Sequence, residues 1–399
     1  MLGLAWLCSV DRWRVSWSLV VKGVLLQFVI AWLILKTPWG KQVFDAAGAG
    51  VQFVLDASNK GTDLVFGRLS NEFGFVFFVH VTGTIILVSA LMSALYYVGV
   101  MQWIVWAMAK VMQVVMGTSG SESLASAANV FVGQTEAPLV IKPYLERMTP
   151  SEINALMVGG MANIAGGVMA AYVGFLSEVG MKDVAGHLLA SSVMSAPSSL
   201  VIAKIMVPET AESETRGHVR MQLEREGRNI LDAICIGAAD GMKLSLNVMA
   251  MLIAFTALVF LVNAGLQGIG SLFGLENLTL ESILGRLFQP LALAMGVPVG
   301  DSDEVGALLG KKTILNEFIA YRDLAGMVEA GTIGDRAAMI STYALCGFAN
   351  FASVAIQIGG IGTLVPSRRA DLARFGLLSL IGGSLATFMT ANLAGALLR

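Results

Sequence analysis

Charged residues and cysteines are both scarce in this chain of 399 residues. Asp, Glu, Lys and Arg make up 14% of it, and the net charge of −2 lacks the basic excess of a protein that binds nucleic acid. Cys8, Cys235 and Cys346 lie far apart in the sequence, which argues against a disulfide framework or a cysteine-bound metal. A secretory signal is also missing, because no basic residue precedes the short apolar start. We therefore expect neither a nucleic-acid partner nor an organic or metal cofactor.

Hydrophobic residues, in contrast, make up 56% of the chain, a composition typical of a polytopic membrane protein. A spanning helix needs about 20 apolar residues. The sequence thus predicts an all-α membrane protein of about eight spans. Residues 1–10 fall short of this length, and a shortened span, a surface helix and a truncated start all remain open for them. The predicted spans are 16–36, 74–100, 101–116, 153–177, 185–206, 243–265, 338–360 and 375–396.

The polar stretches between the spans indicate the orientation of the chain. Residues 207–229 carry four arginines, which place this loop in the cytoplasm by the positive-inside tendency. Residues 37–72 mix charged and apolar residues, a pattern that favours a helix lying at the membrane surface over a crossing.

A group of polar residues interrupts one of the apolar regions. Gln134, Thr135 and Glu136 are consecutive, and the poor helix formers Gly133 and Pro138 flank them. An ionisable residue at the centre of a bilayer costs about 2.5–3.5 kcal/mol and normally marks a substrate or ion path. The pattern favours a helix that enters the membrane, breaks and turns back. The alternative is a polar patch between packed helices.

Residues 160–166 and 347–353 repeat one short pattern, with Gly, Ala, Asn and Ala at matching places. Their asparagines, Asn163 and Asn350, each follow a glutamate of a broken segment, Glu136 in the first case and Glu317 in the second. An odd number of crossings separates the two patterns, so the two halves should enter the membrane from opposite sides. An inverted repeat with broken helices is a recurrent plan of secondary transporters.

Broken helices also predict a binding chemistry. Unpaired carbonyl and amide oxygens at the breaks can replace the hydration shell of a monovalent cation. Glutamates and amides can instead bind a neutral solute that is rich in hydroxyl groups. Each polar group left unpaired in such a dry site costs about 1–3 kcal/mol, so the site should be selective.

Four stretches of the chain resemble the motifs of the concentrative nucleoside transporters, in order and in spacing: residues 133–144, 160–167, 316–321 and 344–350. The likeness runs from about residue 15 to the end and is strongest for bacterial sodium-coupled members. It implies a homotrimer in the lipid of the bacterial inner membrane. Each subunit would import nucleosides such as uridine together with sodium, by an elevator-like motion against a fixed scaffold.

The resemblance further implies how the chain is divided. Two re-entrant hairpins, at about 118–148 and 288–320, and two broken helices, at 152–178 and 338–360, would build the mobile transport domain. The expected segments are an N-terminal scaffold (1–117), the first half of the transport domain (118–206), a cytoplasmic loop with a connecting helix (207–242), a scaffold span with an amphipathic helix (243–286) and the second half of the transport domain (287–399).

The family's functional residues fall on twelve positions of this chain. The base would be bound by Gln134, Thr135 and Glu136 with apolar support from Val168, and the ribose by Glu317, Asn350 and Ser353, with Phe348 as an aromatic beside the substrate. The sodium ligands would be Asn129, the carbonyl of Val132, Asn163 and the carbonyl of Ile164. Asn163 departs from the small hydroxyl residue usual in the family, which puts ion affinity or coupling in question.

Three alternatives remain open at this stage. A proton-coupled transporter could use Glu136 or Glu317 as its proton carrier. An intramembrane hydrolase could use buried Glu, Asn and Ser, but it would need a base or a metal beside its nucleophile, and the sequence around Ser353 offers neither a histidine nor a metal motif. A channel is disfavoured, because several polar groups on one solute bind it too well for rapid conduction.

Overall fold

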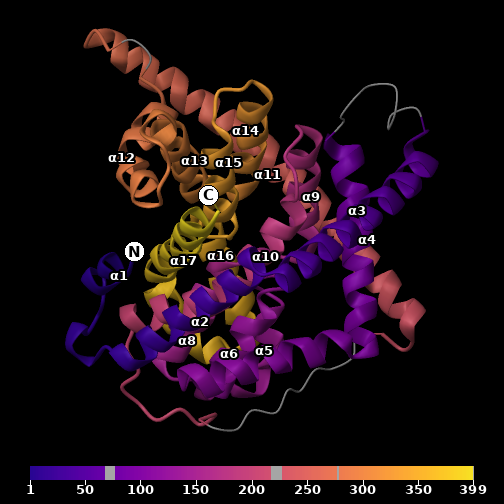
Figure 1. The fold of residues 1–399 in the computed structure, drawn as a ribbon, viewed down its shortest axis with the longest axis vertical. Helices are drawn as coiled ribbons and strands as arrows, with labels where there is room; N and C mark the ends of the chain where they lie inside the picture. Colours follow the sequence, from indigo (N-terminus) through magenta and orange to yellow (C-terminus); the bar gives the residue numbers. More distant parts are fainter. Residues whose placement is uncertain (68–76, 217–226, 276–277, 399) are drawn as a thin grey trace.

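The computed structural model describes residues 1–67, 77–216, 227–275 and 278–398, and helices form their regular structure throughout (Figure 1). This agrees with the predicted all-α fold. Residues 217–226 of the predicted cytoplasmic loop and residues 68–72 of the predicted surface helix lie outside the described residues.

The first part of the chain forms a series of helices, and the last of them is wholly buried. Left-handed glycines separate the last three of them: Gly99 has a φ of 96° and Gly117 a φ of 73°, a region that favours glycine. The helices are α1 (Leu2–Leu7), α2 (Trp17–Lys36), α3 (Pro38–Phe66), α4 (Phe77–Val98), α5 (Val100–Met116) and α6 (Gly120–Ala128).

The predicted first hairpin and first broken helix correspond to short helices. Residues 118–148 contain α6, α7 (Ala137–Val140) and the 3-10 helix η3 (Lys142–Arg147), and α6 packs against α7. Residues 152–178 fall on α8 (Pro150–Ala162) and α9 (Gly166–Glu178), which the chain interrupts at 163–165. The next helix is α10 (Val184–Met206).

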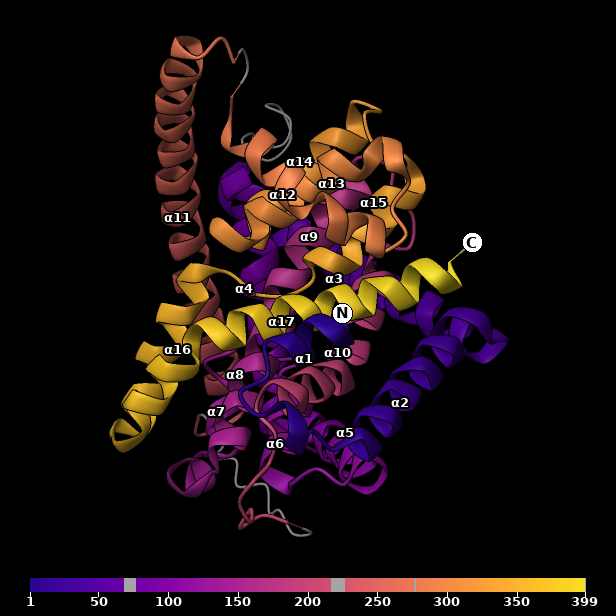
Figure 2. The same cartoon turned by 90° about the vertical axis from the view of Figure 1, so that its left-hand side faces the viewer.

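One long helix, α11 (Ile230–Leu272), follows with 43 residues. Figure 2 shows it at one side of the molecule, and its main neighbour is α4. The sequence analysis divided this stretch at residue 243, but the helix begins at Ile230, where Asn229 accepts the amide of Asp232 as its cap. The predicted connecting helix and scaffold span are therefore one continuous element.

The last third of the chain repeats the broken-helix plan. The predicted hairpin 288–320 covers the end of α12, all of α13 and the start of α14, and the predicted broken helix 338–360 is interrupted at 346–350. The helices are α12 (Leu280–Ala294), α13 (Ser302–Ile314), α14 (Glu317–Glu329), α15 (Asp335–Leu345), α16 (Phe351–Leu364) and α17 (Arg369–Leu397).

Six helical stretches among the described residues are long and apolar enough to span a membrane, where the sequence predicted about eight spans. The other two predicted spans fall on α5 and on the α15–α16 pair, which contain shorter apolar helices. The helices α8 to α10 are almost wholly buried, whereas α2 and α11 expose most of their apolar residues. The structure therefore has a packed centre and outer helices whose apolar faces remain exposed.

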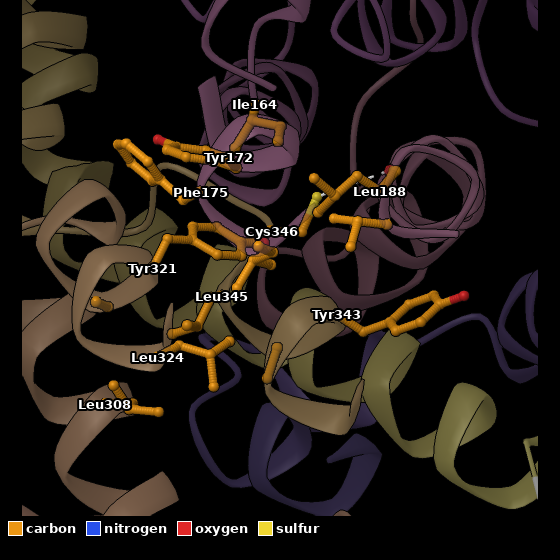
Figure 3. Packing of buried hydrophobic residues seen from close by; sticks show 14 of the residues in the cluster. Ile164, Tyr172, Phe175, Leu188, Leu308, Tyr321, Leu324, Tyr343, Leu345 and Cys346 are labelled. Atoms are coloured by element: carbon orange, nitrogen blue, oxygen red, sulfur yellow. Dashed lines mark hydrogen bonds between the residues drawn. The ribbon is translucent and has the colours of Figure 1, made fainter. Parts of the chain in front are cut away.

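Aromatic side chains connect the first half of the core to the second. Tyr172 of α9 stacks on Tyr321 of α14 with ring centroids 4.2 Å apart, and both side chains are fully buried. Figure 3 shows them beside Ile164 and Cys346, which lie at the two helix breaks. The core therefore holds the two breaks close to each other.

A buried ion pair lies at the start of the predicted first hairpin. Lys204 of α10 lies 2.6 Å from the carboxylate of Glu122 on α6 and 3.1 Å from that of Glu209. The neighbouring Ser121 donates a hydrogen bond to Glu152 at the start of α8. These contacts join α6, α8 and α10 into one packed unit.

Close packing of α17 on α8 leads to a stability prediction. A Cβ added at Gly383 would lie 2.3 Å from the Cβ of Met161, so Gly383→Ala should lower the free energy of unfolding by about 1–3 kcal/mol. Gly359→Ala is the matched control, because nothing lies within 4 Å of its added Cβ. Unfolding in detergent micelles measures both, and an equal loss in the control would contradict the packing argument.

Candidate functional site

The two helix breaks are bonded to each other directly. The backbone amide of Phe348 donates to the carbonyl of Asn163 at 3.2 Å. At Gly347 an added Cβ would lie 2.8 Å from the carbonyl oxygen of Met161, so the backbones meet at a distance that only glycine permits. The two asparagines of the repeated pattern therefore belong to one structural centre.

The start of α16 carries several of the predicted ribose-binding residues. The side chain of Asn350 caps this helix by accepting the amide of Ser353 at 2.8 Å. The hydroxyl of Ser353 accepts a hydrogen bond from the side-chain amide of Gln134 at 3.0 Å. A predicted base-binding residue from the first half thus touches a predicted ribose-binding residue from the second.

Glu317, at the start of α14, extends this chain of contacts. Its carboxylate accepts hydrogen bonds from the side-chain amide of Asn350 at 3.1 Å and from the hydroxyl of Tyr172 at 2.8 Å. Only 5% of Glu317 is exposed. Since a carboxylate has about four lone-pair directions, Glu317 retains capacity to accept further hydroxyl donors. Gln134, Ser353, Asn350 and Glu317 form one continuous polar group.

Glu136 faces a different neighbourhood. It lines a cavity of about 460 Å³ together with Tyr96 of α4, Gln102 of α5 and Asp240 of α11, and it accepts a hydrogen bond from Thr135 at 3.0 Å. Val132 lines the same cavity. The hydrogen bonds of the described residues join Glu317 to Gln134 and leave Glu136 on this second, more open side.

Two further predicted residues lie in apolar surroundings. Val168 is buried in the core cluster that includes Ile164 and Tyr172, and Phe348 is half-buried against the same cluster. Both therefore lie near the polar group, with Val168 on α9 and Phe348 in the second break.

The predicted sodium ligands come from two segments, the end of α6 with the residues after it and the first break. The amide of Gly166 donates to the carbonyl of Phe131 at 3.1 Å and so joins the two segments. Asn129 is 1% exposed, and within the described part of the chain neither its oxygen nor its nitrogen has a hydrogen-bond partner. Ile164 is fully buried. An unpaired amide oxygen at such depth is costly unless a ligand occupies it, which fits a bare cation.

Asn163 is more fully engaged. Its side-chain nitrogen donates to the carbonyl of Gly159 at 3.1 Å, and its oxygen accepts a hydrogen bond from the hydroxyl of Ser195. The resemblance led us to expect a small hydroxyl residue at position 163. Ser195 on α10 places a hydroxyl group next to that position.

Gln357, Tyr172 and Ser195 are site neighbours that the sequence analysis missed. Gln357 is fully buried and donates to Gln134 and to the carbonyl of Met157, each at 3.1 Å. Its amide lies in the apolar run of α16, and a buried amide in such a run is a signal that could have identified it. Tyr172 and Ser195 carry no comparable signal, because their roles depend on contacts with distant segments.

Gln357 provides a test of how Gln134 is positioned. If the site binds uridine, as the resemblance of the sequence motifs implies, Gln357→Leu should raise the uridine concentration for half-maximal uptake about tenfold, because Gln134 and Met157 each lose a buried partner. Thr363→Val on the same helix is the control, since Thr363 is exposed and bonds to its own helix. Uptake at varied uridine concentrations measures both variants. An unchanged affinity in Gln357→Leu would show that Gln134 holds its position without it.

Three family models match the chain. The model described as "Na+ dependent nucleoside transporter C-terminus" covers residues 187–395, the corresponding N-terminal model covers residues 1–69, and a model described as "Nucleoside recognition" covers residues 78–179. Together they extend over most of the sequence, and the first alone covers more than half of it.

Relatives with curated descriptions agree with these models. An uncharacterized transporter of Haemophilus influenzae is 44% identical over 402 residues, which is 99% of this chain and 95% of the relative. Sodium/nucleoside cotransporter 1 of Homo sapiens is 38% identical over 99% of this chain, and solute carrier family 28 member 3 of Mus musculus is 41% identical over 99%. The chain spans 62% and 57% of the lengths of these two mammalian proteins.

Solved structures share the whole fold. CNTnw in an inward-facing substrate-bound state is 39% identical with a TM-score of 0.91, over 99% of this chain and 95% of that one. A variant of CNTnw in an outward-facing state is 38% identical with a TM-score of 0.91, over the same shares of both chains.

Proposed function

Because the chain belongs to the family of Na⁺-dependent nucleoside transporters, we propose that it imports nucleosides together with sodium by alternating access. The resemblance of the sequence motifs to concentrative nucleoside transporters is thereby confirmed. The chain is a multi-pass membrane protein, and we place it in the bacterial inner membrane.

The observation that carries the proposed site is the continuous polar group at the two breaks. Glu317 and Asn350 offer the acceptors and donors that ribose hydroxyls require, since Glu317 keeps free lone pairs after binding Tyr172 and Asn350. Gln134, which donates a hydrogen bond to Ser353, can exchange that partner for a polar edge of the base. Such a dry and fully paired site would reject solutes that lack matching hydroxyl or amide groups.

Sodium would bind where Asn129 has unpaired polar atoms, with the carbonyls of Val132 and Ile164 as further ligands. Asn163 would contribute only by sharing its oxygen with Ser195. Since Gly166 ties the hairpin tip to the first break, an ion there would order the tip before the nucleoside bridges the two halves.

Glu136 would meet the nucleoside from the cavity side. It lies two residues from Gln134, and its cavity opens between the first hairpin and helices α4, α5 and α11. We assign the latter helices to a static scaffold and the broken helices to the moving part, in an elevator-like motion. The exposed apolar faces of α2 and α11 fit lipid contact and the subunit interface of a homotrimer.

Uptake of radiolabelled uridine into proteoliposomes tests this function, with the sodium and pH gradients imposed separately. We expect an inward sodium gradient to drive accumulation and a pH gradient in sodium-free buffer to drive none. Accumulation driven by the pH gradient alone would instead establish the proton-coupled alternative.

The hydrolase alternative predicts that detergent-purified protein converts uridine to product. Ser353 bonds to the amide of Gln134, which cannot act as a general base.

A further inference from the structure

Lys312 is a buried lysine that the proposed transport cycle does not yet use. It lies in the last turn of α13 with no exposed surface. Its Nζ donates hydrogen bonds to the carbonyl of Ala344 at 2.8 Å and to the hydroxyl of Thr387 at 3.0 Å, and it lies 5.7 Å from the ring centroid of Phe388. Both hydrogen-bond acceptors are neutral oxygens.

The acceptor on Ala344 exists because α15 is broken. In an uninterrupted helix the carbonyl of Ala344 would accept the amide of Phe348, four residues later. Here α15 ends at Leu345, and the amide of Phe348 donates to Asn163 instead. Lys312 supplies the hydrogen bond that the break removes, and its charge faces the negative end of the α15 dipole.

In the first half of the repeat, the carbonyl equivalent to that of Ala344 has a different hydrogen-bond donor. Met157 precedes Gly160 by three residues, as Ala344 precedes Gly347 in the matching pattern. The carbonyl of Met157 accepts a hydrogen bond from Gln357, a neutral amide, at 3.1 Å. In the described part of the chain no lysine or arginine bonds this carbonyl of the first break, and the polar atoms of Asn129, next to this break, have no hydrogen-bond partner there.

We propose that Lys312 is the permanently attached cation of the second break, in the role that exchangeable sodium has at the first. The inference rests on the proposed function, because it assumes sodium near Asn129. Lys312 acts as a positioning residue: it holds the end of α15 so that the second break presents Asn350 to Glu317, five residues beyond Lys312. It makes a second exchangeable ion unnecessary in this half.

Neighbouring Lys311, on the same helix, forms ion pairs with carboxylates. Its Nζ lies 3.3 Å from the carboxylate of Glu281 and 2.5 Å from that of Asp323. Lys311 is therefore neutralised by carboxylates near the surface, whereas Lys312 donates to a broken helix end. This difference makes Lys311→Gln the matched control for Lys312→Gln.

The test measures sodium-driven uridine uptake in proteoliposomes for Lys312→Gln, Lys312→Arg and Lys311→Gln. We expect Lys312→Gln to raise the half-saturating uridine concentration about tenfold, because an unpaired buried carbonyl and the lost charge both weaken the nucleoside site. Lys312→Arg keeps the charge and should retain more affinity than Lys312→Gln, and Lys311→Gln should match the wild type. Wild-type affinity in Lys312→Gln would overturn the proposal.

Chemical rescue separates a cation role from simple packing. In Lys312→Ala, added ethylammonium should restore uridine affinity and raise the thermal unfolding midpoint, because it can occupy the vacated position. The same salt should leave Lys311→Ala unchanged. If ethylammonium affects the two variants equally, or restores neither property of Lys312→Ala, Lys312 only fills space. Sodium-independent uptake by the wild type would instead overturn the proposed function. The effects of ethylammonium on Lys312→Ala and Lys311→Ala could still be compared in that case.

Discussion

Glu317→Gln should lower the affinity of sodium-driven uptake for uridine about 100-fold. The carboxylate already binds Tyr172 and Asn350, and its remaining lone pairs are the acceptors proposed for the ribose hydroxyls. A hydrogen bond to a charged group contributes about 1.5–3 kcal/mol. The amide nitrogen of Gln, itself a donor, would also face the donor groups that the carboxylate of Glu317 accepts from. A loss of about 2.8 kcal/mol corresponds to that factor.

Glu329→Gln is the control for this experiment. Glu329 is the last residue of the same helix α14, and it is exposed. Its substitution removes one negative charge without touching the polar group at the breaks. Uptake kinetics with varied uridine measure both variants, and a detergent unfolding curve checks that each is folded. Equal uridine affinities in the two variants would exclude Glu317 from the nucleoside site.

Asn129→Ala should raise the sodium concentration needed for half-maximal uptake about tenfold or more. Its buried amide has no hydrogen-bond partner among the described residues, and bulk water cannot replace an oxygen ligand lost from a bare ion in so closed a place. The lost ion–oxygen interaction is worth at least about 1.4 kcal/mol, a factor of ten.

Asn154→Ala serves as the matched control for this variant. Asn154 is another fully buried asparagine, and it donates to the carbonyl of Ala203 near the other end of α8. The Asn154→Ala substitution should reduce the stability of the fold without changing the sodium concentration needed for half-maximal uptake. The measurement is uptake at saturating uridine with varied sodium, with choline replacing sodium. If both variants shift the sodium dependence equally, the shift reflects general destabilisation and Asn129 is not an ion ligand.

The breaks at 163–165 and 346–350 were predictable because each combines local signals. A polar asparagine stands among small residues inside an apolar run, and the same pattern recurs in both halves. Asn350 is moreover a good helix N-cap, so the sequence favours a new helix start at Phe351. The bonding of Gln134 to Ser353 could not be read in this way, because it depends on how segments more than 200 residues apart pack.

Other features of the structure depend on side-chain direction and on helix continuity. Gln134 and Glu136 stand two residues apart, yet one joins the ribose-binding residues and the other lines a cavity against α4 and α11. The turn between Gly133 and Pro138 determines where the side chains of Gln134 and Glu136 point. Hydrophobic periodicity does not predict side-chain directions in a turn. The continuity of α11 was missed because the sequence analysis ended the connecting helix at residue 242 and began a new span at 243, whereas one helix packs along α4.

The hydrogen bond from Phe348 to Asn163 connects the two halves, so that in the proposed cycle binding at one break can affect binding at the other. Thermodynamic linkage then requires symmetry: whatever factor sodium adds to the affinity for a nucleoside, the nucleoside must add to the affinity for sodium. A cell that keeps internal sodium low would therefore loosen both cargoes at once on the cytoplasmic side. Release there would follow from the ion gradient alone, with no separate trigger.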